Sequence, residues 1–479
     1  MQQYKQEWFG NIRGDILAGI VVCLALFPEV IGFMIVAGVP PIVGVYATFF
    51  ITAIAAFFGS SKGMISAAAG SVALVLAHLV AEYGIQYLFA ATILAGILQV
   101  ALGLLKVGTL MRYIPKPVMT GFVNGLGIMM FTSQLDHFQG SLLLPLLGLL
   151  GIAIIFLFPR VTNKIPAPIV AIFVITAIVL GFGLDVKTLG DMGSISTDLP
   201  RFGIPAVPMT LETLRIIFPT ALSVAIVGLV ESLLTAQLVD EITEEKSDKN
   251  QETLSQGLGN VVSGFFGGIA GCGMIGQTII NLNYGGLGRL ATFLSGFFML
   301  LSVVLLNGSV VQIPVVALAA VMVVVSIETI NWDSIKRLRT NPKNESFAMI
   351  LTVAIVIGTH NLAYGVVAGT LVSAVFAAFK MSHLHVATGT ADDDHHYKVD
   401  GHLYFASAEK FLDFFAEEIE QEEEVVIDIS AMTLWDSTAV EALDKLITRN
   451  NKRGVKTTLT GANTQSSALF KRISIHTEK

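Results

Sequence analysis

A carboxylate stands near the middle of a long apolar stretch, where Glu231 lies in the sequence Leu-Val-Glu-Ser-Leu-Leu-Thr of residues 229–235. An ionisable side chain among so many apolar neighbours is costly, which makes it a candidate functional group. Thr235 follows at i+4, so its hydroxyl lies on the same face of a helix. A carboxylate and a hydroxyl can hold Na⁺ or carry a proton, so we predict a cation-coupling site here. The alternative is a structural carboxylate paired with a neighbouring helix.

A second carboxylate, Glu29, follows Pro28 in the first apolar segment. Proline interrupts the hydrogen-bond ladder of a helix, so this segment is expected to break or kink there. We predict that Glu29 contributes to cation coupling, the alternative being a hydrogen-bonded carboxyl beside a kink. Phe27 and Phe33 flank the break. Phe27 is predicted to line the binding site, although either ring could instead face lipid or the core.

Two segments rich in small residues are too short to cross about 30 Å as helices: Ser66–Val80 and Gly273–Asn283. A helix that begins inside a membrane leaves unpaired N–H groups at its start, and its dipole is positive there. Two such starts near one point would attract an anion without a buried Lys or Arg. The predicted donors are the amides around 69–71 and 274–277. The alternative is a tightly packed helix interface.

Composition identifies the environment of these groups. Of 479 residues, 53% are hydrophobic and 14% are charged, about half the charged share of a soluble protein. This excludes a cytosolic enzyme, a disordered chain and a disulfide-rich secreted module, and it predicts a polytopic membrane protein. The net charge of −7 argues against nucleic-acid binding. Cys23 and Cys272 lie in apolar segments and suggest neither a disulfide framework nor a metal site.

The apolar runs predict up to fourteen segments. The third and tenth are the short ones, and the first of each set of seven carries Glu29 or Glu231, so the chain reads as two halves of seven. Because seven is odd, the halves must have opposite topology, as in transporters with a site at the midplane. The segments are 14–37, 42–58, 66–81, 85–105, 117–134, 141–158, 166–183, 211–238, 252–269, 275–284, 289–306, 310–327, 345–360 and 362–381.

Basic residues predict the orientation. With a cytoplasmic N-terminus and fourteen alternating segments, nearly all Lys and Arg residues between the segments fall on the inner side, and only Lys187, Arg201 and Arg215 fall on the outer side. This bias matches the rule that cytoplasmic loops are basic. We therefore expect both termini in the cytoplasm.

The tail is richer in charge than the rest of the chain. Its alternating pattern predicts a small α/β domain with strands at 397–406, 424–429 and 455–460 and helices at 408–421, 437–451 and 464–472. The predicted divisions are a transmembrane domain over 1–382, a linker over 383–396 and a cytoplasmic domain over 397–479. Ser437 would begin a helix, where a hydroxyl caps and a phosphate is well received, so it is a candidate regulatory residue. The alternative is a plain N-cap.

Several motifs resemble one family. Residues 27–33 (Phe-Pro-Glu-Val-Ile-Gly-Phe) and 37–47 (Ala-Gly-Val-Pro-Pro-Ile-Val-Gly-Val-Tyr-Ala) resemble the SulP, or sulfate permease, signature. Residues 231–235 resemble the eighth span of that family, and 267–273 lead into its tenth. Asp428-Ile429-Ser430 and the 435–439 run (Trp-Asp-Ser-Thr-Ala) resemble the STAS domain that ends most members. The resemblance covers essentially the whole chain.

The resemblance implies seven plus seven inverted spans, a core and a gate domain, and in many members a homodimer. It implies a secondary transporter of a small inorganic anion in the bacterial inner membrane, working by elevator-type alternating access. Bicarbonate is favoured over sulfate or chloride, and no cofactor is expected beyond a possible coupling Na⁺. Glu231 and Thr235 would form the cation site. The residues implied to line the anion site are Ala69, Gly70, Ser71, Gly273, Met274 and Ile275.

Two departures from the family bear on the substrate. The third segment begins Ala67-Ala68-Ala69 where relatives often have Gly-Pro-Thr, and Gln277 stands where many carry Arg. Two helix starts offer roughly one unit of positive charge, which suits a monovalent anion better than a divalent one. Gln277 is therefore predicted to tune which anion is bound. The rival functions are a nucleobase permease of the same fold and a STAS-linked sensor or scaffold with little transport; an enzyme is not expected.

Overall fold

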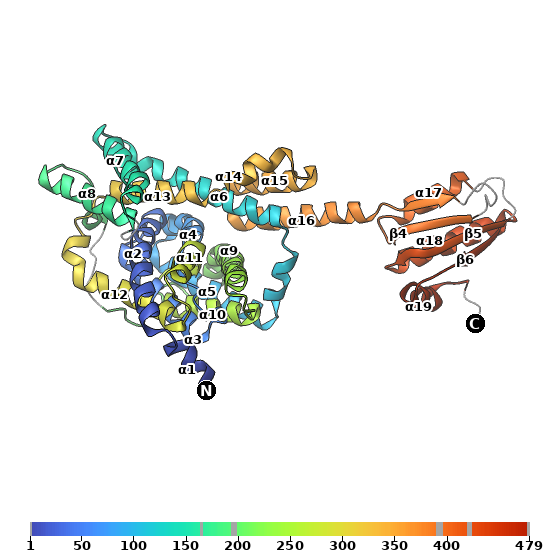
Figure 1. Cartoon of the computed structure of the whole chain (residues 1–479), viewed down its shortest axis with the longest axis horizontal. Helices are drawn as coiled ribbons and strands as arrows, with labels where there is room; N and C mark the ends of the chain where they lie inside the picture. The colour runs from blue at the N-terminus through green and yellow to red at the C-terminus, as the bar shows by residue number, and fades with distance from the viewer. Residues whose placement is uncertain (1, 163–165, 193–198, 389–395, 419–423, 477–479) are drawn as a thin grey trace. The chain divides into compact units, whose positions relative to one another are not determined.

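The computed structural model describes the chain except residues 1, 163–165, 193–198, 389–395, 419–423 and 477–479. It forms two compact units, Met1–Thr370 and Leu371–Lys479. The first unit is almost wholly helical (Figure 1), and each predicted apolar segment contains one helix. Six described helices are long and apolar enough to cross a membrane alone, or seven if a bent pair counts as one span. Fourteen spans therefore stay a prediction.

One group of helices, here the first bundle, packs around α2 and α9. Where α5 crosses α10, a β-carbon on Gly96 would lie 2.6 Å from the carbonyl oxygen of Gly257. These glycines let the two helices pack backbone against backbone, as small residues do in membranes. The members are α2 (Ile12–Ala37), α3 (Pro41–Phe58), α4 (Gly70–Tyr83), α5 (Ile85–Leu104), α9 (Leu211–Thr243), α10 (Lys249–Phe265), α11 (Ile275–Asn283) and α12 (Arg289–Val310).

A second bundle contains α6, α7, α8, α13 and α15, with α13 packed against α6, α7 and α8, and α15 against α6. Gly365 of α16 lies against α15, where its β-carbon would meet Val356. The two bundles meet where α13 packs against α2. The members are α6 (Lys116–Gln134), α7 (Leu143–Leu157), α8 (Ala167–Gly181), α13 (Val315–Thr329) and α15 (Lys343–Thr359). The helix α16 (Leu362–Met381) begins in the first unit and continues into the second, and α1 (Gln2–Phe9) and α14 (Trp332–Lys336) are short.

A two-stranded ribbon precedes the two short helices. β1 (Ser66–Ala68) leads into α4 and β2 (Gly271–Gly273) leads into α11, and the strands pair antiparallel with Ala67 opposite Cys272. The sequence analysis did not predict these strands. They have a physical reason, because extended backbone buried in a membrane must satisfy its N–H and C=O groups within the protein. Pairing fixes the starts of α4 and α11 next to each other.

Large apolar side chains remain exposed on the outside of the second bundle. Leu146 and Leu149 of α7 and Phe173 of α8 are 64%, 65% and 73% exposed. A soluble protein rarely leaves such a surface to water. Lipid is the solvent that accepts it, in agreement with the predicted membrane domain.

The second unit holds a four-stranded sheet in the order β3-β4-β5-β6, with β3 antiparallel to β4 and the other pairs parallel. The predicted strands and helices are all present, but β5 runs five residues beyond the expected 429 to Leu434. One strand, β3, lies inside the segment predicted as a linker. The elements are β3 (His385–Thr388), β4 (His396–Leu403), α17 (Ala408–Glu418), β5 (Glu424–Leu434), α18 (Ser437–Lys452), β6 (Lys456–Thr460) and α19 (Thr464–Ile473).

Candidate functional site

A cavity of about 390 Å³ opens between the two bundles at the starts of α4 and α11. The first bundle contributes Glu29 and Phe33 from α2, Glu231 and Leu234 from α9, and residues of 69–71 and 273–277. The second bundle contributes Val123, Leu126 and Met130 from α6 and Val325, Glu328 and Thr329 from α13. Segments that are far apart in the chain thus build one chamber.

The starts of both short helices face this chamber without a side-chain cap. The N-cap residues are Ala69 for α4 and Met274 for α11, and neither side chain accepts a hydrogen bond from the first turn. Most helices satisfy these donors with Ser, Thr, Asp or Asn at the cap. Two uncapped helix starts at one cavity provide N–H donors and positive dipole ends for an anion.

Not every predicted amide donor is available. The Gly273 amide donates to the Ser232 hydroxyl at 2.9 Å, and the Met274 amide donates to the Ile65 carbonyl at 2.8 Å. Both residues line the cavity, but these bonds hold the ribbon rather than a ligand. On this side the donors that remain are the first-turn amides of α11, beginning at Ile275.

Glu231 accepts hydrogen bonds from two side chains, one at the start of α4 and one in β2. Its Oε2 accepts hydrogen bonds from the Ser71 hydroxyl and, at 2.7 Å, from the Cys272 thiol. Thr235 is placed differently from the prediction, because its hydroxyl donates to the main-chain oxygen of Glu231 at 2.8 Å and it does not line the cavity. In this structure the predicted pair therefore does not converge on one point.

Glu29 also lines the cavity, and it is hydrogen-bonded to the residue predicted to tune selectivity. Gln277 Nε2 donates to Glu29 Oε2 at 2.5 Å. Phe27 does not join them: it lines a separate, mostly apolar cavity between α2, α8 and α12, since it lies two positions from Glu29 and faces another way on the helix. Phe33, one turn on from Glu29, lines the chamber instead and packs so closely that a β-carbon on Gly70 would lie 2.7 Å from its ring.

Among the residues that the sequence analysis did not assign to the site, Glu328 and Cys272 matter most for its charge. Glu328 lies one residue beyond the predicted segment 310–327, whereas α13 continues to Thr329 and carries Glu328 into the cavity. Cys272 lies in an apolar segment and suggests neither a disulfide nor a metal site, so it has no predicted role. Its contact with Glu231 arises from the pairing of β1 with β2, and only that pairing could have indicated it.

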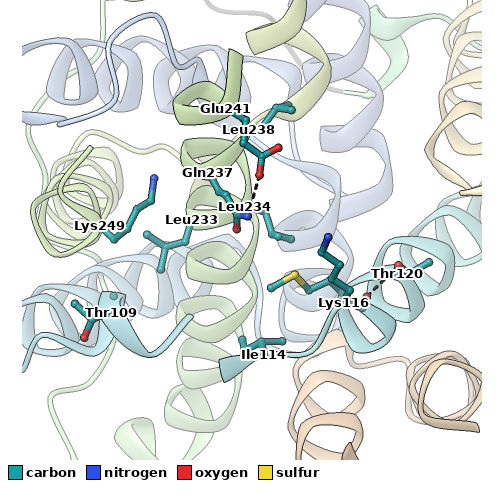
Figure 2. Close-up of a pocket in the computed structure, with 12 residues that line it drawn as sticks. Thr109, Ile114, Lys116, Thr120, Leu233, Leu234, Gln237, Leu238, Glu241 and Lys249 are labelled. Carbon is teal, nitrogen blue, oxygen red and sulfur yellow. Dashed lines mark hydrogen bonds between the residues drawn. The ribbon is translucent and has the colours of Figure 1, made fainter. Parts of the chain in front are cut away.

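A larger cavity of about 770 Å³ adjoins the first, and Leu234 lines both. Figure 2 shows Lys249 and Thr109 on one side of α9 and Lys116 and Thr120 on the other. On α9 itself, the Gln237 amide donates a hydrogen bond to the Glu241 carboxylate. The ammonium group of Lys249 is paired with Asp240 at 2.7 Å. Lys116, at the start of α6, has no ion pair within the described part of the chain. The larger cavity is therefore lined by two charged groups without an ion pair in the described chain, the Lys116 ammonium and the Glu241 carboxylate.

In the second unit, the structure places Ser437 as the exposed first residue of α18 but assigns the cap to its neighbour. Asp436 Oδ1 accepts from the Ala439 amide at 2.9 Å, so the Ser437 hydroxyl is not the capping group. Asp428, where the pairing of β5 with β6 ends, accepts from the Ser430 amide at 2.8 Å, and this backbone hydrogen bond lowers the pKa of the Asp428 carboxyl. The exposed Ser437 hydroxyl stays a candidate for modification.

Comparison with known proteins agrees with this architecture. The sulfate permease family matches residues 12–143 and 141–352, and the STAS domain matches residues 386–478. "Putative sulfate transporter YbaR" of Bacillus subtilis is 50% identical over 473 residues, covering 98% of each chain. The bicarbonate transporter BicA of Picosynechococcus is 28% identical over 421 residues, covering 80% of this chain and 73% of BicA. A structure of SLC26A9 shares the fold, with a TM-score of 0.83 at 18% identity over 96% of this chain and 86% of that one.

The fold and the chamber between two helix bundles define a multi-pass membrane transporter of anions. The chain belongs to the sulfate permease family and ends in a STAS domain. The predicted helical membrane fold with a C-terminal STAS domain is thereby confirmed, while the count of fourteen spans stays a prediction. Because that family consists of transporters, an enzymatic role is not indicated.

Proposed function

We propose that this protein is a secondary transporter of a small inorganic anion, with bicarbonate favoured, and that uptake is coupled to Na⁺ or H⁺ through Glu231. The observation that carries the proposal is the pair of uncapped helix starts, at Ala69 and Met274, which face one cavity together with Glu231. Helix ends attract an anion, whereas an ionised Glu231 repels it. A cation that neutralises Glu231 therefore raises anion affinity, which is the definition of coupling.

Charge supports a monovalent substrate. The residues that line the chamber in the described chain include no Lys, Arg or His, so its positive potential comes from helix dipoles that sum to about one unit. A divalent anion would leave a second negative charge uncompensated. The name of YbaR nevertheless makes sulfate the second candidate, and the name of BicA agrees with bicarbonate.

Movement of one bundle against the other would expose the chamber to the two sides in turn. We propose an elevator-type cycle in which α4, α9 and α11 carry the anion past α6 and α13. The larger cavity with Lys116 would then be part of the route to the cytoplasm. We further propose a homodimer in the bacterial inner membrane with both termini cytoplasmic.

Uptake into proteoliposomes tests the substrate and the coupling ion. Labelled bicarbonate, sulfate and chloride are offered separately, with a Na⁺ gradient, a pH gradient or neither, and liposomes without protein serve as the control. We expect bicarbonate uptake to exceed sulfate uptake and to depend on one of the two gradients. Transport of none of the three anions would contradict the proposal, and faster uptake of sulfate would replace bicarbonate by the second candidate.

Orientation has its own test. A single cysteine is introduced into 383–396 or at Lys246, in a chain whose native Cys23 and Cys272 are buried. Membrane-impermeant labelling should fail in intact cells and succeed in opened ones. Labelling from outside would refute cytoplasmic termini.

A further inference from the structure

The chamber holds more negative charge than the coupling role of Glu231 explains. Glu29 of α2, Glu231 of α9 and Glu328 of α13 all line it, and no basic side chain does so within the described residues. Two helix starts contribute roughly one positive unit together. If all three carboxylates were ionised, an entering anion would meet a net negative site.

The three carboxylates differ in their partners. Glu231 accepts from Ser71 and Cys272, and Glu29 accepts from Gln277. These donors stabilise the ionised forms. Glu328 has neither a hydrogen-bond donor nor an ion pair in the part of the chain that the structure describes, and its charged neighbour is Glu29, of the same sign. Glu328 is also the most exposed of the three carboxylates. A negative charge that enters the chamber raises the proton affinity of every carboxylate nearby, and Glu328 alone of the three lacks a side-chain donor in the described chain that would stabilise its ionised form.

Glu328 also lies on the other side of the interface. Glu29 and Glu231 belong to helices of the first bundle, whereas α13 packs within the second bundle against α6, α7 and α8. Any relative movement of the bundles changes the distance between Glu328 and an anion held by α4 and α11. The charge of Glu328 can therefore act on both anion entry and bundle movement.

We infer that Glu328 is a specificity and coupling residue, which must be protonated before the chamber accepts an anion. This inference rests on the proposed function. The proton comes from water in the cavity, forms an O–H bond on the Glu328 carboxylate and returns to water when the anion leaves. Anion affinity then falls as the pH rises, because deprotonated Glu328 repels the anion. A divalent anion is repelled twice as strongly as a monovalent one.

Glu328→Gln tests the inference because it removes the charge and keeps the shape. Chloride is the probe, since its own charge does not change with pH. Its apparent affinity is measured by proteoliposome uptake from mildly acidic to mildly alkaline pH. The variant should bind chloride roughly tenfold more tightly than wild type at alkaline pH and equally well at acidic pH. Anion binding to wild type should take up about one proton more than anion binding to the variant, so the affinity of the variant should depend less on pH.

Two further variants serve as controls. Glu328→Asp keeps the charge and should retain the pH dependence of wild type. Glu345→Gln removes a carboxylate from α15 in the same bundle but outside the chamber, and should also match wild type. If Glu328→Gln keeps the wild-type pH profile while wild type transports, the inference is wrong and the proposed function stands. If wild type takes up no anion at all, the proposed function itself fails.

Discussion

At Glu231 the carboxylate has two donors on one oxygen and an open side toward the chamber. Glu231→Gln keeps the shape and removes the charge that a cation must neutralise. We expect a folded protein in which a cation gradient no longer stimulates uptake, whereas in wild type such coupling changes anion affinity by roughly 5–150-fold. Uptake with and without the gradient is the measurement. A stable variant with normal gradient-driven uptake would show that coupling resides elsewhere.

Gln277 tests the electrostatic account of selectivity. Gln277→Arg places a full positive charge beside the start of α11, within reach of Glu29, which already accepts from this side chain. The Arg guanidinium would compensate negative charge on both Glu29 and the anion. The variant should therefore shift toward sulfate and depend less on the coupling cation. Competition between labelled sulfate and bicarbonate measures the shift. Gln139→Arg adds the same charge at an exposed position outside the chamber and should change neither property.

Between elements, Asn260 of α10 fixes the ribbon that starts α11. Its side chain accepts from the Gly271 amide at 2.8 Å and donates to the Gly271 carbonyl at 3.1 Å, in a buried site. Asn260→Ala leaves both backbone groups without partners, which lowers the free energy of unfolding by about 1–3 kcal/mol per group. Thermal unfolding in detergent should show a lower Tm.

A matched control is available on the next helix. Asn283→Ala removes the same amide from an exposed position at the end of α11, where no hydrogen bond to its side chain is described. Its Tm should equal that of wild type. Equal Tm values for both variants would mean that the ribbon does not depend on Asn260.

On the scale of the whole molecule, the chamber and the STAS domain are separate. Every residue that lines the chamber falls between Glu29 and Thr329, within the first unit. Removal of the tail should therefore alter assembly or regulation but leave anion affinity unchanged.

The truncation should be made before His383, because β3 pairs with β4 and a cut at 397 would leave β3 as an unpaired edge. Anion affinity of the truncated protein is measured by uptake, and its assembly by size-exclusion chromatography with light scattering. Loss of anion binding in a well-folded truncated protein would contradict this separation.

The sequence determined by itself which segments are helical and which two are short, because apolar runs, Gly clusters and isolated carboxylates are local patterns. Glu29, Glu231 and the starts of α4 and α11 could be singled out for the same reason: a charge or a small-residue run is conspicuous among apolar neighbours. The second unit was also readable, since its strands and helices alternate in periodicity.

The tertiary structure determines which residues distant in the sequence come into contact. Pairing of β1 with β2 brings Cys272 and Ser71 onto Glu231. Two of the amides that the sequence offered as donors are bonded within the protein, that of Gly273 to the Ser232 hydroxyl and that of Met274 to the Ile65 carbonyl. The rotation of α2 puts Phe33 rather than Phe27 at the chamber, and the length of α13 adds Glu328. These contacts join residues separated by tens to hundreds of positions. Helical spacing fixes relations only within one element, so no local pattern could have supplied them.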